Sequence, residues 1–372
     1  MSGIYVHIPF CKSRCIYCDF YSTTGGDNAQ QARYVTALIE EYRKRIGELK
    51  GSPVTTLYIG GGTPSQLSPD LLSQLFAAID HSSVNEFTVE VNPDDVDADY
   101  AEALYALGVN RVSMGVQSFI DNELKIINRR HTSKQAIDAV SILKSVGINN
   151  ISIDLIYGLP LQSLQSWQVS VEQAVRLGVQ HISAYNLTYE EGTLLTRLRD
   201  TGQIVEANDE LCVAMYNLLA DKLRQAGYEH YEISNFALSG FRSRHNSAYW
   251  DFTPYLGLGA GAHSFDGETR RYNPADINSY LTHIEGGTTA AIAEPMEWWE
   301  HYDELIMLRL RTADGLDARD ILKRFGEKVY RDFLIKAQPL VDNGELMRTC
   351  YIYSIAPTHV MRSDAVILQL MH

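Results

Sequence analysis

Short apolar runs alternate with longer segments of helical periodicity through the first half of the chain. Six of these runs have the length and the flanking turn residues of β-strands: 4–8, 55–59, 87–91, 111–116, 151–156 and 181–186. Amphipathic helices are expected between them, among them 29–49, a helix that begins near Pro69, 133–145 and 164–177. Strands that alternate with helices of this length pair in parallel through right-handed crossovers. The pattern therefore predicts an α/β fold, a partial (β/α)6 barrel.

The pattern changes after about residue 273. Apolar positions at helical spacing predict helices at 279–285, 298–310, 318–325 and 329–341, and short strands are expected within 346–361. This change, together with a length of 372 residues, favours two domains. We expect residues 1–272 to form the barrel and its extension, and residues 273–372 to form a mainly helical C-terminal domain.

Composition and charge narrow the class of protein. Hydrophobic residues make up 45% of the chain and charged residues 21%, as in globular proteins with a substantial core. No apolar run approaches the ~18 residues that a membrane span requires, and no apolar signal segment precedes the first strand, so we expect a cytoplasmic protein. The formal net charge of −14 argues against broad binding of nucleic acid, which needs a face rich in Lys and Arg.

Three of the five cysteines fall within eight residues, directly after the first predicted strand. Cys11, Cys15 and Cys18 have the spacing C-x3-C-x2-C. Cysteines that merely fill a core would be scattered, and three thiols in one short loop cannot all pair in disulfides. A structural zinc site normally has four protein ligands, and no second Cys or His pair follows downstream. Iron and sulfide are therefore favoured, with three thiolates that leave one iron of a [4Fe–4S] cluster open.

Polar side chains follow several of the predicted strands. In barrels of this kind the chemistry lies at the carboxyl ends of the strands, where the βα loops gather around one mouth. The glycine turn at 60–64 allows a ligand to approach the backbone closely, although a purely structural tight turn would look the same. Glu90 and Arg129, taken alone, also fit solvated positions. Gln117 follows an apolar run, and Asp154 lies within one and needs a ligand or a partner.

The cysteine spacing, with Tyr17 just before the last cysteine, resembles the signature of radical S-adenosylmethionine (SAM) proteins. The resemblance implies that the three cysteines bind a [4Fe–4S] cluster whose open iron chelates the methionine part of SAM. One electron from the cluster would cleave the sulfonium to a 5′-deoxyadenosyl radical, while the protein orients and shelters the cofactors. By the same resemblance, the residues that bind SAM are Tyr5, Tyr17, Gly61, Gly62, Thr63, Glu90, Gln117, Arg129 and Asp154.

Four longer motifs are similar to one subgroup of that superfamily: YxHIPFC at 5–11, GGGTP at 60–64, GVQSF at 115–119 and DLIYGLP at 154–160. The subgroup is the oxygen-independent coproporphyrinogen III dehydrogenase family, which includes a heme-chaperone (HemW-type) branch. In the dehydrogenase branch a further cysteine stands where this chain has Phe20, and an N-terminal extension precedes the first strand. Both differences favour the chaperone branch. The C-terminal residues resemble the family's winged-helix-like domain.

The segment RHNSAYW at 244–250 resembles an HNxxYW element of the chaperone branch. His245 is therefore a predicted axial ligand of heme iron, although a histidine hydrogen-bonded within a packed loop would look the same. His263 is a second candidate. Cys212 and Cys350 are expected to be structural. Four arginines nearby suit the carboxylates of heme or of another tetrapyrrole: Arg242, Arg244, Arg270 and Arg271.

The resemblance implies a heme chaperone that binds a [4Fe–4S] cluster, SAM and heme and delivers the heme to a hemoprotein. Its electron donor would be a protein such as a flavodoxin or ferredoxin. Whether SAM is cleaved stays open, and no residue is assigned a catalytic role. The alternative is an enzyme, the dehydrogenase that decarboxylates the propionates of coproporphyrinogen III to give protoporphyrinogen IX. A radical SAM enzyme with another substrate is the third possibility.

Overall fold

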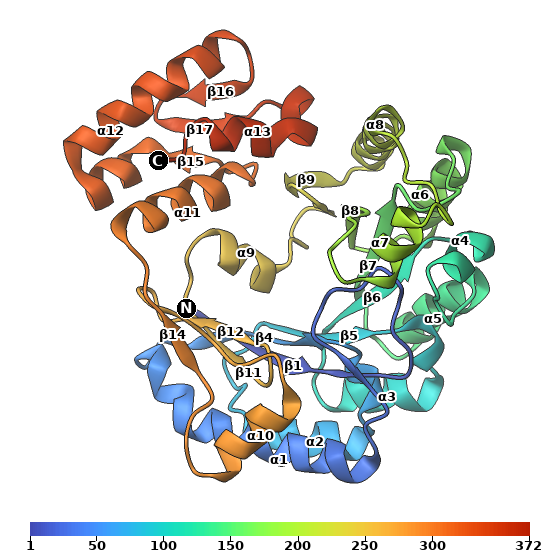
Figure 1. Cartoon of the computed structure of the whole chain (residues 1–372). Coiled ribbons are helices and arrows are strands. Elements are labelled where there is room, and N and C mark those ends of the chain that lie inside the picture. The colour runs from blue at the N-terminus through green and yellow to red at the C-terminus, as the bar shows by residue number, and fades with distance from the viewer.

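The computed structural model describes residues 1–372, and its main feature is a twelve-stranded sheet that curls into a partial barrel (Figure 1). Six neighbouring strands of this sheet are parallel and follow one another in chain order. They are β1 (Ser2–Ile8), β4 (Val54–Gly61), β5 (Glu86–Val91), β6 (Arg111–Gln117), β7 (Asn150–Tyr157) and β8 (His181–Asn186). The predicted α/β fold with a partial (β/α)6 barrel is confirmed.

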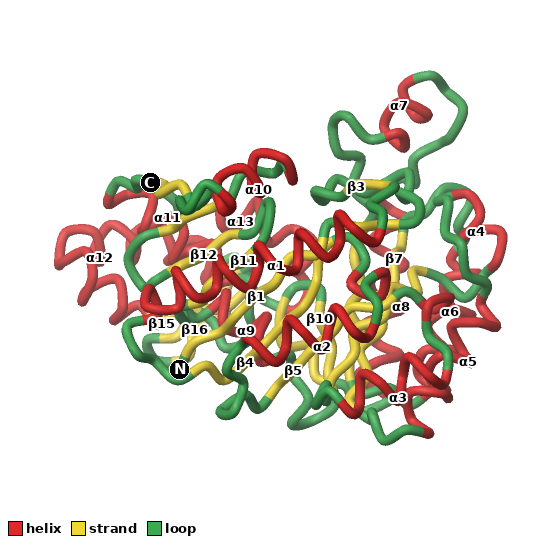
Figure 2. The backbone as a smooth tube through the Cα atoms, turned by 90° about the horizontal axis from the view of Figure 1, so that it is seen from below, coloured by secondary structure: helices red, strands yellow, loops and turns green.

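Helices between these strands cover the outer face of the barrel, as Figure 2 shows. Their bounds are α1 (Asn28–Arg45), α2 (Pro69–Ala78), α3 (Ala98–Ala106), α4 (Asp121–Ile126), α5 (Ser133–Ser145) and α6 (Leu164–Leu177). Five of them begin after a polar side chain that accepts a hydrogen bond from the first turn: Asp27, Ser68, Asp97, Thr132 and Ser163. Such caps satisfy backbone N–H groups that lack a partner within the helix. No helix of the chain has both the length and the apolar character needed to cross a membrane.

Six short strands extend the two edges of the barrel. At one edge, β11 pairs with β1 in parallel and is followed by the antiparallel strands β12, β13 and β14. At the other edge, β10 and then β9 follow β8 in antiparallel pairing. Their bounds are β9 (Glu229–Glu232), β10 (Asn235–Ala237), β11 (Tyr255–Leu258), β12 (His263–Phe265), β13 (Arg270–Tyr272) and β14 (Ile292–Glu294). Around them lie the helices α7 (Leu194–Asp200), α8 (Asp209–Gln225) and α9 (Arg244–Trp250). The sequence pattern does not predict these strands, because so few residues show no clear alternation.

A buried carboxylate ties α1 to the β11 edge of the barrel. Glu41 is fully buried, and its two oxygens accept hydrogen bonds from four groups. The donors are Arg45 Nη1 (2.6 Å), Asn273 Nδ2 (2.8 Å), the backbone N–H of Gly259 (2.8 Å) and the Tyr280 hydroxyl (2.7 Å). The charge is therefore buried with both a counter-ion and a full set of donors, the condition under which a buried ion pair is tolerated.

The C-terminal residues form a second, smaller core. Its elements are α11 (Trp298–Leu310), β15 (Leu316–Asp317), α12 (Ala318–Asp342), β16 (Leu346–Thr349), β17 (Ile352–Ile355), a short 3-10 helix η4 (Pro357–Arg362) and α13 (Ser363–Leu368). Gly326, with φ of 83° and ψ of 177°, interrupts α12. The interruption lies between the predicted helices 318–325 and 329–341. The expectation of a mainly helical domain is confirmed.

The two cores divide the chain later than we predicted. The helix α10 (Ile277–Glu285) contributes Ile277 and Tyr280 to the core of the barrel, and β14 is part of the barrel sheet. The second core begins with Tyr302. The boundary expected after residue 272 is therefore moved to the segment between β14 and α11. The reason is that α10 turns its apolar face toward the barrel, which its periodicity alone does not reveal.

We predict that Glu41→Gln destabilises the protein by about 3 kcal/mol, because it removes the buried carboxylate that pairs with Arg45 and leaves that guanidinium with the part-exposed Glu48 as its remaining counter-charge. The matched control is Glu40→Gln on the same helix, where the ion pair with Arg43 is exposed and the expected loss is below ~1 kcal/mol. Urea unfolding followed by circular dichroism measures both values. Equal losses in the two variants would contradict the structural role of Glu41.

Candidate cluster and cofactor site

A cavity of about 790 Å³ opens at the carboxyl ends of the barrel strands. Its wall contains the three clustered cysteines and eight of the nine residues predicted to bind SAM: Tyr17, Gly61, Gly62, Thr63, Glu90, Gln117, Arg129 and Asp154. The exception is Tyr5, which lies deeper in β1 and whose hydroxyl is 3.1 Å from His7 Nδ1. The grouping follows from the topology, because parallel strands bring their carboxyl ends to the same edge.

The cysteine loop is held from two sides. On one side, Cys11 Sγ is 3.4 Å from the Thr63 hydroxyl in the glycine turn after β4. A Cβ atom at Gly62 would lie 2.9 Å from Cys11 Sγ, so this close approach requires glycine. On the other side, Arg129 Nη1 donates to Cys15 Sγ (3.5 Å). The thiols therefore face the cavity between a glycine turn and a cation.

The three thiols suit a cluster that takes three protein ligands. They are free and line the cavity, and in a [4Fe–4S] cluster each thiolate binds a different iron. Burial raises the pKa of the Cys11 and Cys18 thiols. A bound metal reverses this effect, because a coordinated thiol is deprotonated.

Glu90 joins the glycine turn to the interior of the barrel. Its carboxylate accepts hydrogen bonds from the Tyr58 hydroxyl (2.8 Å) and from the backbone N–H of Gly61 (3.1 Å). Gly61 has φ of 117°, which is strained for residues with a side chain. Burial raises the pKa of Glu90 to about 7 and that of Asp154 to about 6. The cavity thus holds two carboxyl groups that are costly to ionise alone and that favour a cationic ligand.

Gln117 and Arg129 complete the rim of the cavity. Gln117, the last residue of β6, has φ of 66°, an uncommon conformation that is concentrated at functional sites. Arg129 Nη2 donates to Asn92 Oδ1 (2.8 Å) and to the Gly115 carbonyl. The buried Nε of Arg129 has no partner in the protein. Such a donor costs about 1–3 kcal/mol when it is left unpaired, so it suits an acceptor group of a bound ligand.

Arg111 is a site residue that our sequence analysis missed. Its side chain is 1% exposed, and its Nε and Nη1 donors have no hydrogen-bond partner. Because side chains alternate along a strand, Arg111 shares the inward face of β6 with Ser113, which lines the cavity. Its positive charge lowers the pKa of Glu90 and Asp154 and so opposes the effect of burial. The sequence does contain a sign of this role, because Arg111 is a charged residue at a position of an apolar strand whose side chain points into the barrel.

The C-terminal domain contributes one side of the cavity wall. Met361 from η4 and Asp364 from α13 line the cavity, and the Tyr157 hydroxyl lies 3.5 Å from Met361 Sδ. These residues are far from the cysteine loop in the sequence, and no local motif connects them to it. The site is therefore built by both domains, a feature that the strand-end argument does not predict.

His245 lies at the amino ends of the strands, away from the cavity wall. The carboxylate of Glu86 accepts a hydrogen bond from the backbone N–H of His245 (2.8 Å) and so holds the start of α9. The imidazole is 1% exposed, with Nδ1 bonded to the Thr56 hydroxyl (2.8 Å) and Nε2 to the Tyr249 hydroxyl (2.9 Å). Burial, together with the charge of Arg111, lowers the pKa of His245 to about 3, so the ring is neutral. Coordination of heme iron by Nε2 requires the Tyr249 hydroxyl to leave, and this role of His245 stays a prediction.

The predicted basic group of four arginines is largely neutralised, and only Arg244 forms no ion pair. Three of the arginines pair with carboxylates: Arg242 with Glu229 (3.5 Å) and Asp314 (3.3 Å), Arg270 with Glu304, and Arg271 with Asp266 (2.9 Å). Only Asp266 is close in sequence to the arginine that it pairs with, so the sequence alone gives the wrong impression of a free basic patch. His263 is exposed on β12.

A cysteine loop, a glycine turn and polar strand ends around one cavity of a partial barrel define a radical SAM protein, and residues 5–174 match the Radical SAM superfamily. The chain is 34% identical over 350 residues to the heme chaperone HemW of Bacillus subtilis (strain 168), an alignment that covers 92% of each chain. It is 40% identical over 285 residues to HemW of Lactococcus lactis subsp. lactis (strain IL1403), covering 75% of this chain and 74% of that relative. The chain therefore belongs to the HemW family of radical SAM proteins.

A solved structure shows the same fold. It is coproporphyrinogen III oxidase (HemN) from Escherichia coli, a radical SAM enzyme, which has a TM-score of 0.85. The match covers 100% of this chain and 90% of that chain at 21% identity, so it supports the fold alone. Membership of the radical SAM superfamily implies a [4Fe–4S] cluster and SAM as cofactors.

We predict that replacement of Cys11, Cys15 and Cys18 together by Ala reduces the iron and sulfide content of the reconstituted protein to background. The circular dichroism spectrum should be unchanged, because the three residues lie outside both hydrophobic cores. The matched control is Cys350→Ser, which removes an exposed thiol far from the cavity and should leave the iron content intact. Undiminished iron in the triple variant would show that these thiols are not the ligands.

Proposed function

We propose that this protein binds heme and delivers it to a hemoprotein, with a [4Fe–4S] cluster and SAM held at the mouth of the barrel. The observation that carries the proposal is the similarity to the heme chaperone HemW over 92% of both chains, which extends well beyond the superfamily match at 5–174. Phe20 supports it, because this residue lines the cavity where the dehydrogenase branch has a further cysteine.

In this proposal Cys11, Cys15 and Cys18 hold the cluster, and the chain's own polar groups orient SAM. A bound, reduced cluster would supply the electron for cleavage of a carbon–sulfur bond of SAM. The ionised Glu90 carboxylate is complementary to the ammonium group of SAM, and Arg129 Nε is complementary to its carboxylate. The remaining contacts are assigned to residues of the same wall: Tyr17, Gly61, Gly62, Thr63, Gln117 and Asp154.

Tyr5 is given an indirect role. Its hydroxyl is bonded to His7 Nδ1, and the His7 ring lies so close to Gly61 that a Cβ atom there would be 2.7 Å away. Tyr5 thus supports the glycine turn from below without lining the cavity. Direct contact of Tyr5 with SAM stays a prediction.

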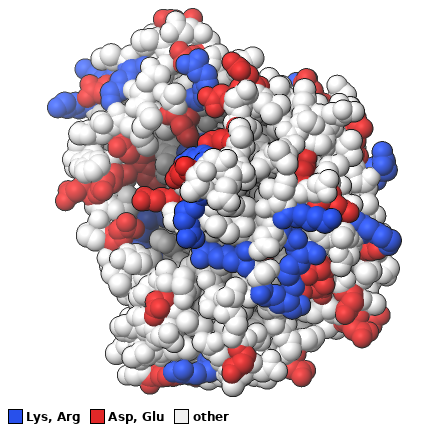
Figure 3. Space-filling model, turned by 45° about the vertical axis from the view of Figure 1, so that its right-hand side comes forward, with Lys and Arg blue, Asp and Glu red and all other residues white.

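The surface beside the cysteine loop suits an acidic electron donor such as a flavodoxin or ferredoxin. Arg14, Lys125 and Arg197 are exposed and form no ion pair in the protein. They lie near the loop because Asn128 donates to the Arg14 carbonyl (2.9 Å) and the backbone of α7 bonds to Ile16. Lys and Arg side chains gather on the side of the molecule that carries α4 to α7 (Figure 3). Beside the exposed carboxylates of Asp19, Glu190 and Glu191, these cations offer contacts to the acidic groups of a partner.

The alternative function is the decarboxylation of coproporphyrinogen III, and the aromatic part of the cavity lining is compatible with it. Tyr157, Tyr185 and Tyr216 line the cavity on the side away from the cysteines. These aromatic side chains offer contact area to a tetrapyrrole in either function. Both functions therefore involve a tetrapyrrole. In one the protein transfers it unchanged, and in the other it decarboxylates it.

We predict that the affinity for SAM rises roughly fivefold to tenfold between about pH 6 and about pH 7.5. Glu90, with a pKa near 7, is mostly protonated at the lower pH and cannot then attract the ammonium group of SAM; it ionises as the pH rises. Equilibrium dialysis of labelled SAM with the anaerobic protein measures the affinity. Glu90→Gln should bind SAM more weakly and with a flatter pH profile. An equally steep profile in this variant would rule out Glu90 as the titrating group.

We predict that the anaerobically reconstituted protein binds heme with one-to-one stoichiometry and transfers it to an apo-hemoprotein. With SAM and a reductant it should form no protoporphyrinogen IX from coproporphyrinogen III. Heme titration by absorbance and a porphyrin assay by chromatography, run on the same preparation, provide the two measurements. Sustained turnover of coproporphyrinogen III would overturn the chaperone proposal in favour of the alternative.

A further inference from the structure

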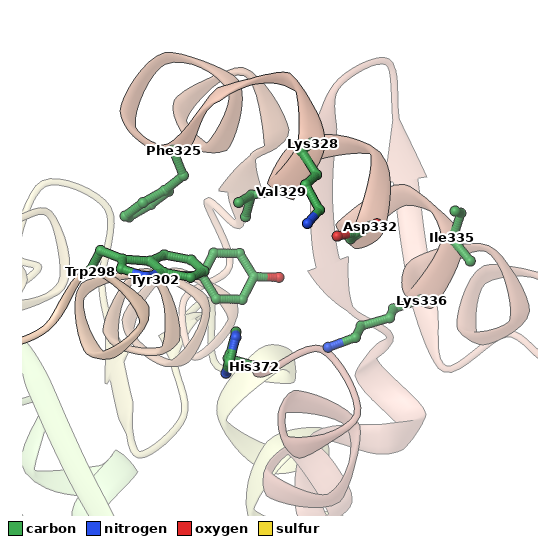
Figure 4. A pocket seen from close by; sticks show the side chains of 9 residues that line it. All are labelled: Trp298, Tyr302, Phe325, Lys328, Val329, Asp332, Ile335, Lys336 and His372. Atoms are coloured by element: carbon green, nitrogen blue, oxygen red, sulfur yellow. The ribbon is translucent and has the colours of Figure 1, made fainter.

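A second cavity, of about 700 Å³, lies within the C-terminal domain between α11 and α12 (Figure 4). It shares no lining residue with the cavity at the barrel mouth. None of the motifs of the sequence analysis falls on it. We refer to this cavity as the C-terminal groove and define it by Trp298, Phe325, Lys328, Lys336 and His372.

The groove is formed where α12 is interrupted. Gly326, with φ of 83°, separates the turn that carries Phe325 from the segment that carries Lys328 and Lys336. The left-handed conformation is one that glycine adopts without strain. A continuous helix would place these side chains on one straight surface, whereas the interruption sets an aromatic ring at one end of the groove and two lysines farther along it (Figure 4).

Aromatic side chains line one end of the groove and remain accessible. Trp298 is 50% exposed, and its ring meets the His372 ring edge-on at 5.3 Å between centroids. Phe325 faces Trp298 across the groove (Figure 4). Exposed apolar surface of this kind, bordered by polar residues, is typical of a binding site.

The imidazole of His372 has two ring nitrogens without a hydrogen-bond partner in the protein. Its ring lines the groove, and neither ring nitrogen forms a hydrogen bond within the protein, although the backbone N–H donates to Asp303 Oδ1 (2.7 Å). In this respect it differs from His245, whose two ring nitrogens are both engaged. A histidine that is held by its backbone and whose ring nitrogens are free is suited to bind the metal of a ligand that enters the groove.

Two lysines give the groove a positive end. Lys328 forms no ion pair, and Lys336 donates only to the Met371 carbonyl oxygen. Asp332 is the single acidic side chain of the lining, against the two lysines. Accessible ammonium groups beside an apolar surface are complementary to an apolar ligand that carries carboxylates.

We propose that the C-terminal groove binds heme, and the inference rests on the proposed function. Heme combines the three properties that the groove matches: a flat apolar ring for Trp298 and Phe325, propionates for the lysines, and an iron for His372. The groove is open to solvent, which suits a ligand that has to be handed on. Heme at this site leaves the barrel mouth free for the cluster and SAM.

Heme titration of the full-length protein, followed by absorbance, tests the proposal with three variants of the C-terminal domain and with His245→Ala. Lys328→Glu/Lys336→Glu should weaken heme binding about tenfold. Lys323→Glu/Arg331→Glu makes the same change of charge on α12 outside the groove and should leave the affinity within about twofold of the wild type. His372→Ala should alter the Soret band, and added imidazole should restore it. Circular dichroism verifies that each variant is folded.

The outcomes separate the groove from the proposed function. If the wild type binds heme but neither the groove variant nor His372→Ala differs from it, the groove assignment is overturned while the chaperone proposal stands. If only His245→Ala changes the heme spectrum, the ligand lies beneath the barrel and the groove is likewise excluded. If the wild type shows no saturable heme binding, the proposed function itself fails.

Discussion

The barrel depends on how its first strand is fixed, because β1 carries the cysteine loop and lies between two parallel neighbours, β4 and β11. Glu41 accepts hydrogen bonds from the chain just after β11 and from α10, and it thereby fastens that side of the sheet to α1. Tyr34, also on α1, donates to the His7 carbonyl (3.0 Å) near the end of β1. One helix thus holds both the strand that leads into the loop and its neighbour.

The interior of the barrel is unusually polar for such a fold. The inward side chains of ordinary barrels are mostly branched and apolar, whereas here Arg111, Glu90 and Asp154 share the interior with tyrosines and histidines. The positive charge of Arg111 keeps the two carboxyl groups from shifting further toward their neutral forms. Arg111 therefore acts mainly through its charge, which sets the ionisation of the carboxyl groups in the cavity, rather than through packing.

The sequence was sufficient to predict the barrel and most of the residues around its mouth, because both follow from the local pattern of apolar and polar positions. Strands of the right length, alternating with capped helices, allow one topology, and that topology brings Glu90 and Asp154 together. What the pattern does not contain is the pairing of distant segments. The short edge strands, the attachment of α10 to the barrel and the contribution of Met361 to the cavity all depend on such contacts. The same limit applies to His245, since its partners Thr56 and Tyr249 become apparent only once the chain has folded.

Met361 and its neighbours on η4 and α13 give the molecule a further property. They form part of the cavity wall, and Met361 packs against the barrel core although it lies in the C-terminal part of the chain. Backbone hydrogen bonds from Ile233 to Arg311 and from Ala313 to Tyr231 fasten the same part of the chain to the edge of the barrel. The cofactor cavity therefore has a complete wall only when the C-terminal domain is docked on the barrel.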